Sequence, residues 1–424
     1  MSTGSMLAKT RLDVVVIGGG AAGMMAALQA AYAGASVILL EKNEKLGKKI
    51  YITGKGRCNV TNVADIDDFF RQVPRNAKFL NAACRQFTHE DVTATLEMLG
   101  TPTKVERGGR VFPESDKASD VTKALHHGMK DAGVQVELNC EVSHVRKEGS
   151  LFAAEFTQGG TLYAKTVIVA TGGLSYPSTG STGDGFRFAK ENGHSITPLK
   201  GSLVGLTIDE KWPKLLQGLS LKNVRVRAKA GKKAIYDELG EMLFTHFGVS
   251  GPLIIELSSH LPDDFASVNV TLDMKPALTD EQLDLRLQRE FAENARKQLS
   301  SVLLTLMPSR MGPVFAELCG MAGDTPVGQI TREQRQTIGR MLKALPLNVT
   351  GTRPIEEAIV TRGGVEVKEI LPGTMMSRKQ EGLYFAGEVL DVDAHTGGFN
   401  LQIAFSTGAL AGKSAAAYAM ETEE

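Results

Sequence analysis

Residues 14–23 read Val-Val-Val-Ile-Gly-Gly-Gly-Ala-Ala-Gly. The β-branched residues predict a strand buried on both faces, and the small residues after them predict a sharp turn into a helix that runs to about Ala33. Gly18, Gly20 and Gly23 have the GxGxxG spacing of a dinucleotide-binding turn. There, the first glycine permits the bend, the second lets the backbone approach a diphosphate, and the third lets the helix pack closely on the strand.

A second strand and an acidic residue complete this βαβ unit. Residues 36–40 predict the strand, which ends at Glu41, about 20 residues beyond the glycine turn. A carboxylate at this position accepts hydrogen bonds from ribose hydroxyls and argues against a 2′-phosphate, so FAD or NAD is expected rather than NADP. The helix N-terminus, with Ala21 and Ala22 in its first turn, supplies N–H groups for the diphosphate.

Three later segments favour FAD over NAD. Residues 166–169 and 382–386 predict strands that end in glycine turns, and residues 397–402 open a helix rich in Ala and Gly. The N-terminus of that helix can stabilise negative charge on a reduced flavin. No second complete GxGxxG is present for a separate nicotinamide domain. The cofactor contacts expected from these segments come from Ala170, Thr171, Gly172, Gly387, Glu388, Asn400, Leu401 and Gln402.

A lysine-rich stretch that begins at Lys42 leads into a second glycine-containing loop, residues 53–59, which read Thr-Gly-Lys-Gly-Arg-Cys-Asn. Its glycines suit backbone packed against a flat ring or phosphates, and Arg57 and Asn59 could reach phosphate and flavin edges. A solvated basic loop is the alternative, although Cys58 is too apolar for an ordinary exposed loop. We expect cofactor contacts from Lys42, Gly54, Arg57, Cys58 and Asn59.

These segments, together with residues 182–185, 245–248 and 361–364, resemble the bacterial BaiN-like flavoproteins, which are also described as aminoacetone-oxidase-like or NAD(P)/FAD-dependent oxidoreductases. The resemblance covers essentially the whole chain. Several segments are also similar to succinate dehydrogenase and fumarate reductase flavoprotein subunits. The resemblance implies an FAD enzyme of the glutathione-reductase-like superfamily, with NAD(P)H as a candidate electron donor. It also implies that the strand leading to Val142 passes near the adenine, with ordinary sheet packing as the alternative.

The expected fold class is α/β, a Rossmann-like FAD-binding domain interrupted by an inserted domain. Residues 1–193 and 346–424 form the discontinuous FAD-binding domain, and residues 194–345 form the inserted substrate or cap domain. Short β-like runs between turn signals predict a small barrel or sandwich over 194–275. Apolar residues at helical spacing predict a helical part over 276–345. The insert could be one domain or two.

Three polar residues are candidates for catalysis at the substrate face of the flavin. His246 lies between two aromatic residues and could equally be a hydrogen-bonded histidine at a domain interface. Arg362 precedes two glycines in a segment that the resemblance brings over the ring, where it could bind an anion or donate a proton; a surface arginine is the alternative. His395 stands just before the glycine pair at 397–398, so we expect it close to the flavin.

Composition limits the partners. Among the 424 residues, Lys+Arg 48 equals Asp+Glu 48, so no overall positive field exists to hold nucleic acid or an anionic membrane. We therefore expect a small-molecule substrate, no nucleic-acid partner and no membrane, and the oligomeric state stays open. The four cysteines form no CxxC pair, so no metal site is expected and a reducing cytoplasm fits best. The apolar stretch over 14–40 imitates a membrane span, but glycines interrupt it and predict strand, helix, strand.

The expected activity follows from the cofactor and the resemblance. We expect an FAD-dependent oxidoreductase that transfers a hydride between flavin N5 and a small organic substrate. Reduction of an activated C=C bond is favoured by the segments similar to fumarate reductase. Amine oxidation with O₂ is the enzyme alternative that the aminoacetone-oxidase-like description suggests. A flavin-binding RNA-modifying or redox-sensing protein is a further alternative, and the neutral net charge weighs against its RNA version.

Overall fold

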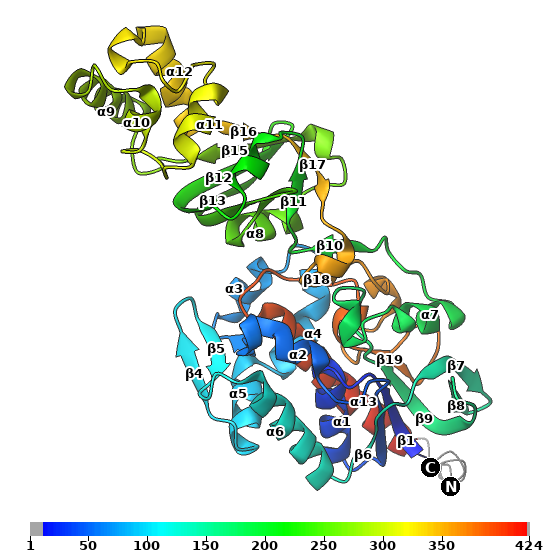
Figure 1. Cartoon of the computed structure of the whole chain (residues 1–424). Helices are drawn as coiled ribbons and strands as arrows, with labels where there is room; N and C mark the ends of the chain where they lie inside the picture. The colour runs from blue at the N-terminus through cyan, green and yellow to red at the C-terminus, as the bar shows by residue number, and fades with distance from the viewer. Residues whose placement is uncertain (1–11, 422–424) are drawn as a thin grey trace. The chain divides into compact units, whose positions relative to one another are not determined.

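The computed structural model describes residues 12–421, which form two units (Figure 1). The first unit contains the residues up to Ser202 and those from Ile355 onward, and the second contains Leu203–Pro354. The expected boundaries, 193/194 and 345/346, lie somewhat earlier in the chain. Each unit has its own hydrophobic core.

A seven-stranded sheet forms the centre of the first unit, in the order β6-β2-β1-β9-β8-β7, with β19 also paired to β9. Strands β6, β2, β1, β9 and β19 run parallel, whereas β8 pairs antiparallel with the first half of β9, and β7 with β8. This confirms the expected α/β class. The strands are β1 (Leu12–Ile17), β2 (Val37–Leu40), β6 (Gln135–Glu137), β7 (Val142–Glu148), β8 (Leu151–Phe156), β9 (Thr161–Val169) and β19 (Leu383–Phe385).

The register of the parallel strands brings their carboxyl ends together. Ile17 at the end of β1 pairs with Leu40 of β2 and with Val169 of β9, and Phe385 of β19 also pairs with Val169. The segments that follow these four residues therefore start side by side at one edge of the sheet. Ligands of open parallel sheets bind at this edge.

Two helices pack against each other beside this sheet (Figure 1). They are α1 (Ala21–Tyr32) and the C-terminal α13 (Phe399–Glu421). A Cβ on Gly408 would lie 2.3 Å from the carbonyl oxygen of Ala22, and one on Gly412 would lie 2.2 Å from that of Ala26. The glycines of α13 therefore allow backbone-to-backbone packing of the two helices.

The rest of the first unit covers the sheet and its ligand edge. Residues 61–113 include a three-stranded sheet in the order β3-β5-β4, and β10 pairs antiparallel with β18. The remaining elements are α2 (Lys48–Ile52), α3 (Ile66–Arg71), α4 (Asn81–Gln86), α5 (His89–Met98), α6 (Ala118–Asp131), α7 (Asp184–Glu191), β3 (Thr61–Asn62), β4 (Thr103–Glu106), β5 (Arg110–Pro113), β10 (Lys200–Ser202) and β18 (Val360–Arg362).

The second unit contains a seven-stranded antiparallel sheet in the order β16-β15-β12-β13-β14-β11-β17. The sheet curls, so that β17 contacts β15 and the turn that precedes β15. Its strands are β11 (Leu206–Ile208), β12 (Ser220–Ala230), β13 (Lys233–Thr245), β14 (Gly248–Ser250), β15 (Val268–Asp273), β16 (Leu345–Leu347) and β17 (Val349–Thr352). The helices are α8 (Pro252–His260), which packs on β13, then α9 (Asp280–Glu293), α10 (Leu299–Leu303), α11 (Met311–Leu318) and α12 (Arg332–Lys343).

The apolar stretch over 14–40 folds as strand, helix and strand, as predicted. Within residues 12–421, no helix combines the length and the hydropathy that crossing a bilayer requires.

Candidate cofactor site

An open cleft lies at the carboxyl edge of the parallel strands. The turn after β1, the segments after β2 and β9, and the start of α13 all contribute to its walls. Many of the residues predicted to contact the cofactor line this one cleft: Gly18, Gly20, Ala21, Ala22, Glu41, Lys42, Val142, Ala170, Thr171, Gly172, Gly387, Glu388, Asn400 and Leu401.

The three glycines of the turn after β1 are required for different reasons. Gly18 has φ +105°, and a Cβ there would lie 2.5 Å from the carbonyl oxygen of Ala170. A Cβ on Gly23 would lie 1.8 Å from the oxygen of Gly18, so this glycine allows the helix to pack on the turn. Gly20 has φ −81°, and a Cβ there would meet no atom within 4 Å, yet this glycine lines the cleft. The fold leaves space for a side chain at Gly20, and without one this space is open for a ligand to approach the backbone.

Glu41 is held rigidly at the end of β2. Its carboxylate is buried, with Oε2 2.7 Å from the backbone nitrogen of Gly19, which donates to it. Oε1 accepts from the backbone N–H of Asn43 at 2.8 Å and from Asn43 Nδ2 at 2.6 Å. The carboxylate is therefore a fixed acceptor beside the glycine turn, where the resemblance to dinucleotide-binding turns places a ribose.

A second carboxylate in the cleft, that of Glu388, is held by groups distant in sequence. Lys49 Nζ lies 2.7 Å from Glu388 Oε2 and 2.6 Å from Ser175 Oγ, which itself donates to Glu388 Oε1 at 2.8 Å. The backbone N–H of Thr361 donates to the same oxygen at 2.8 Å. Burial alone would raise the pKa of Glu388, but the ammonium of Lys49 and these hydrogen bonds outweigh it and lower the pKa.

Lys42 forms an ion pair across the cleft wall. Its Nζ lies 2.7 Å from Asp184 Oδ2 at the start of α7, and Thr182 Oγ1 is a further partner. Burial would raise the pKa of Asp184, but Lys42 more than offsets this and the pKa is lowered. The pair fixes α7 against the segment after β2.

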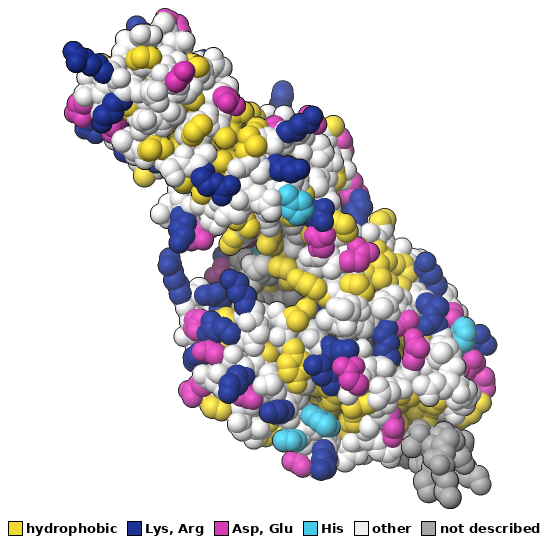
Figure 2. Space-filling model, in the orientation of Figure 1, with side chains coloured by type: hydrophobic (Ala, Val, Ile, Leu, Met, Phe, Trp, Pro, Cys, Tyr) yellow, Lys and Arg dark blue, Asp and Glu magenta, His cyan; other side chains and the backbone are white. Residues whose placement is uncertain are grey.

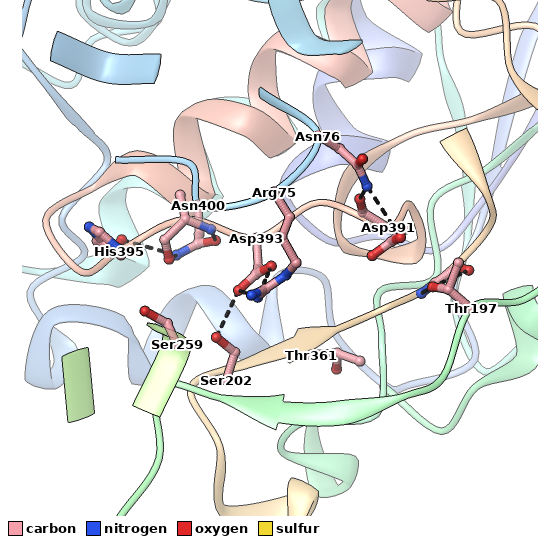
Figure 3. A network of polar contacts seen from close by, with 12 residues as sticks. Arg75, Asn76, Thr197, Ser202, Ser259, Thr361, Asp391, Asp393, His395 and Asn400 are labelled. Carbon is pink, nitrogen blue, oxygen red and sulfur yellow. Dashed lines mark hydrogen bonds and ion pairs between the residues drawn. The ribbon is translucent and has the colours of Figure 1, made fainter. Parts of the chain in front are cut away.

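Asn400 fixes the loop that precedes α13 (Figure 3). Its Nδ2 donates to the carbonyl oxygens of Ala394, at 2.7 Å, and His395, at 3.2 Å, and its Oδ1 accepts from the N–H of Ala394 at 2.9 Å. His395 Nδ1 lies 3.1 Å from Gln72 Oε1, and the imidazole is buried. Asn400 lines the cleft and His395 does not, so His395 supports the loop that Asn400 holds.

An acidic residue of the same loop forms an ion pair that no sequence motif indicates (Figure 3). Arg75 Nη2 lies 2.6 and 2.7 Å from the two oxygens of Asp393, which is fully buried. Ser202 Oγ donates to Asp393 Oδ2 at 2.7 Å. The loop before α13 is thereby held from two directions, by residues that are far apart in the sequence.

Several predicted contact residues lie outside the cleft lining. Arg57 bonds instead to Glu106 and Asp116, with Nε 2.9 Å from Asp116 Oδ1, and its guanidinium lies 4.2 Å from the ring centroid of Phe112. Cys58 is fully buried in the core, which raises the pKa of its thiol to about 12. The predicted residues outside the lining are Gly23, Gly54, Arg57, Cys58, Asn59 and Gln402.

These residues lie outside the cleft lining for different physical reasons. Asn59 lies beside the turn before α13, since its Oδ1 would be 3.0 Å from a Cβ on Gly398. Gln402 is buried in α13, where its Nε2 donates to Phe87 O at 3.1 Å and to Ser406 Oγ at 2.8 Å. Gln402 therefore fixes α13 to the connection between α4 and α5.

The two remaining catalytic candidates do not line the cleft either. Arg362 ends β18, directly after Thr361, whose Oγ1 accepts from the N–H groups of Leu174 at 2.8 Å and Ser175 at 3.1 Å. His246 belongs to the second unit, at the turn between β13 and β14, where its ring lies edge-on to Phe247 with centroids 5.1 Å apart. Their catalytic roles stay predictions.

The residues of the cleft fit FAD. The backbone at Gly20, which lines the cleft with nothing within 4 Å of a Cβ, leaves room for a diphosphate. The fixed carboxylate of Glu41 lines the same cleft, so the two together match an extended ligand with a diphosphate and a ribose.

Residues 12–414 match the HI0933-like protein Rossmann domain. The chain belongs to this family. It is 31% identical over 407 residues to the 3-dehydro-bile acid delta(4,6)-reductase of Clostridium scindens, covering 95% of this chain and 98% of the relative. It is also 31% identical over 398 residues to the ribosomal RNA dihydrouridine synthase of Escherichia coli, covering 94% of this chain and 96% of the relative.

A solved structure shares the fold of this HI0933-like protein at low identity. The 3-ketosteroid-delta4-(5alpha)-dehydrogenase of Rhodococcus jostii RHA1 superposes with a TM-score of 0.53 at 14% identity, covering 96% of this chain and 97% of that chain. The first unit is thus a Rossmann-type FAD-binding domain, and this HI0933-like protein is an FAD-dependent oxidoreductase. The resemblance to BaiN-like flavoproteins is confirmed.

Proposed function

We propose that this HI0933-like protein reduces a carbon–carbon double bond that is conjugated to a carbonyl group. The proposal rests on the names of two relatives. One relative is a delta(4,6)-reductase of a 3-dehydro bile acid, and another makes dihydrouridine in ribosomal RNA. Their substrates differ in size and class, yet both names describe the addition of hydrogen across a double bond near a carbonyl. A shared site that serves both chemistries is a flavin site for hydride transfer.

The residues of the first unit would position FAD for this reaction. When bound, FAD supplies a hydride acceptor and donor for the substrate carbon. The N–H groups at the start of α1 and the backbone at Gly20 would bind the diphosphate, and Glu41 would bind the ribose. The N-terminus of α13, whose preceding loop Asn400 holds, would face the ring with its partial positive charge.

Reduction of a conjugated double bond also needs a proton for the carbon next to the carbonyl, and a group that polarises the carbonyl oxygen. We assign one of these roles to Arg362, which belongs to the same unit as the cofactor cleft, and His246 of the second unit stays a candidate from the sequence. The guanidinium of Arg362 carries several N–H donors in a planar fork, which suits the binding of a carbonyl oxygen. His246 is exposed.

Anaerobic reoxidation tests the proposal. The protein is loaded with FAD, reduced with dithionite and mixed without oxygen with a 4-en-3-one steroid, with unmodified ribosomal RNA, or with aminoacetone. We expect the absorbance of the oxidised flavin to return with the steroid or the RNA and not with the amine. Product analysis should then show a saturated bond. If none of the unsaturated compounds reoxidises the flavin, whereas the oxidised protein is reduced by the amine and forms peroxide in air, the proposal is wrong.

A further inference from the structure

The charge that is balanced over the whole chain is unevenly distributed within the second unit. Residues 222–233 contain six basic residues and no acidic one. Elsewhere, on the face of the molecule in Figure 2, basic and acidic side chains are interspersed. The basic residues of this segment lie on β12, in the turn that follows it and at the first residue of β13: Lys222, Arg225, Arg227, Lys229, Lys232 and Lys233.

Strand alternation gathers these cations on one face of the sheet. Val224, Val226 and Ala228 are buried, with exposed fractions of 3%, 0% and 0%. Arg225, Arg227 and Lys229 alternate with them, and Lys229 is exposed. Since successive side chains of a strand point to opposite faces, the three cations share the outward face of β12. Lys232 and Lys233 extend it into the exposed turn.

Among the cations of this segment, only the two arginines form ion pairs with neighbouring acidic residues in the described part of the chain. Asp237 on β13 lies 2.9 Å from Arg225 Nη1 and 3.5 Å from Arg227 Nε. Asp273 on β15 lies 3.5 Å from Arg227 Nη1, but it is closer to Lys343 Nζ, at 2.8 Å.

The positive charges of the lysines are not neutralised by ion pairs in this way. The four exposed lysines of the segment, namely Lys222, Lys229, Lys232 and Lys233, form no ion pair among the described residues. In the register of the sheet, the neighbours of Lys229 are the uncharged Asn269 and Ala234. Lys222 has no partner in the register, because the pairing of β12 with β13 shifts between Leu221 and Val224. A net positive charge is therefore left at the β12–β13 turn.

The spacing of the cations suits a chain of phosphates. Alternate residues of a strand lie about 7 Å apart, which is close to the separation of successive phosphates along an extended single strand. Leu239, 54% exposed, stands opposite Arg225 on the same face and offers an apolar contact for a base. A positively charged surface that follows the phosphate backbone is typical of proteins that bind single-stranded nucleic acid.

We propose that the outward face of β12, with the β12–β13 turn, binds the phosphate backbone of RNA. The inference rests on the proposed function and deepens it, because it places the double bond to be reduced in a uridine of an RNA strand. It departs from the expectation of no nucleic-acid partner, which used the net charge of the whole chain and not its local distribution. A steroid carries no row of phosphates, so the cations of this face would not contribute to its binding.

Salt-dependent RNA binding tests the inference. The test variant replaces Lys222, Lys229, Lys232 and Lys233 by glutamine. A matched control replaces four exposed lysines of the first unit, Lys78, Lys123, Lys130 and Lys190, by glutamine, which removes the same charge. Binding of a fluorescent oligouridine of about 20 nucleotides is followed by anisotropy at several salt concentrations. FAD content and melting temperature serve as checks of folding.

We expect the test variant to bind the oligouridine at least about tenfold more weakly than wild type. The slope of log affinity against log salt should fall by about 3, because each lysine lost from a single-strand contact removes about 0.7. The control should keep nearly the wild-type slope. Equal binding by wild type and test variant, or an equal loss in the control, would overturn the inference. Binding of phosphatidylglycerol vesicles through these lysines, without RNA binding, would also overturn it.

The inference and the proposed function fail in different ways. If the oligouridine binds through these lysines but no unsaturated compound reoxidises the reduced flavin, the surface stands and the proposed reaction is wrong. If a steroid enone is reduced and no RNA binds, the reaction stands and the surface assignment is wrong.

Discussion

Glu41 Oε2 lies 2.7 Å from the backbone nitrogen of Gly19, so the carboxylate after β2 is hydrogen-bonded to the glycine turn after β1. The other oxygen accepts two hydrogen bonds from Asn43. The side chain is buried and cannot turn away. If Glu41 binds the ribose as proposed, this acceptor is fixed before the cofactor binds, which lowers the entropy cost of binding.

Replacing Glu41 by glutamine should weaken FAD binding. The substitution removes the charge from an acceptor that the ribose hydroxyls would use, which costs about 1.5–3 kcal/mol. The dissociation constant measured by titrating apoprotein with FAD should then rise about 10- to 150-fold. Glu44→Gln is the matched control, because Glu44 is exposed on the same loop and pairs with Lys48. Unchanged affinity in Glu41→Gln would remove Glu41 from the site.

Gly20→Leu should give a folded protein without bound flavin. Gly20 has no neighbour within 4 Å of a Cβ and a negative φ, so the fold accepts the side chain. The leucine would instead occupy the space in which the diphosphate approaches the backbone. Gly373→Leu is the control, because Gly373 is exposed and also has nothing within 4 Å. The ratio of flavin absorbance to protein absorbance decides the matter, and a fully flavinated Gly20→Leu protein would contradict the account.

Arg362→Gln and His246→Gln should retain FAD and lose turnover. General acid–base groups contribute about 10²- to 10⁴-fold to rate, so the decrease in kcat should fall in this range. Arg107→Gln and His127→Gln, at exposed positions of the first unit, should leave the rate unchanged. FAD content and half-reaction rates are measured on all four proteins. Wild-type turnover in both test variants would leave the flavin alone as the reactive group.

Acid should destabilise the fold through a buried cluster around His194. Its Nδ1 lies 3.2 Å from Glu369 Oε2 and its Nε2 lies 2.7 Å from Ser377 Oγ. Burial lowers the pKa of His194 below 6.5, so protonation favours the unfolded chain as pH falls below that value. Burial would raise the pKa of Glu369, but Lys379 and Ser195 outweigh it and lower the pKa from 4.5 to about 2.

The carboxylate of Glu369 therefore contributes stability above pH 4.5 that is lost as pH falls toward 2. Glu369→Gln should remove this contribution, so that the fall in melting temperature between pH 5 and pH 3 is smaller than in wild type by roughly 2–4 °C. Glu114→Gln, at an exposed position, should keep the wild-type profile. Parallel acid profiles for Glu369→Gln and wild type would show that Glu369 is not the group responsible.

The sequence predicts the glycine turn, Glu41 and the strand ends because their signals are local. Gly18 and Gly23 are needed by the fold itself, and Glu41 follows at a fixed distance. The partners of Glu388 could not be predicted in this way, because Lys49 is 339 residues away and lies in a lysine-rich run with no motif of its own. The contact exists only after β19 has joined the sheet.

Arg57 shows the opposite case, in which the local sequence predicts a cofactor contact but the side chain pairs with acidic residues of the protein. Its glycine-rich loop predicts a phosphate contact, yet Glu106 and Asp116 supply carboxylates to the same guanidinium. Neither acid stands out in the sequence, and both reach Arg57 through the β4–β5 hairpin and the residues after it. Long-range charge pairing of this kind can be read only from the fold.

The most direct test of the proposed reaction is the mass of its product in D₂O. The FAD-loaded protein is reduced with dithionite in D₂O, so that both transferred hydrogens come from the solvent, and is mixed with either a 4-en-3-one steroid or unmodified ribosomal RNA. The product is analysed by mass spectrometry. The account predicts loss of one carbon–carbon double bond and gain of two deuterium atoms on the two carbons that it joined, in the steroid or in a uridine. Unchanged substrates, with peroxide formed from an amine in air, would contradict it.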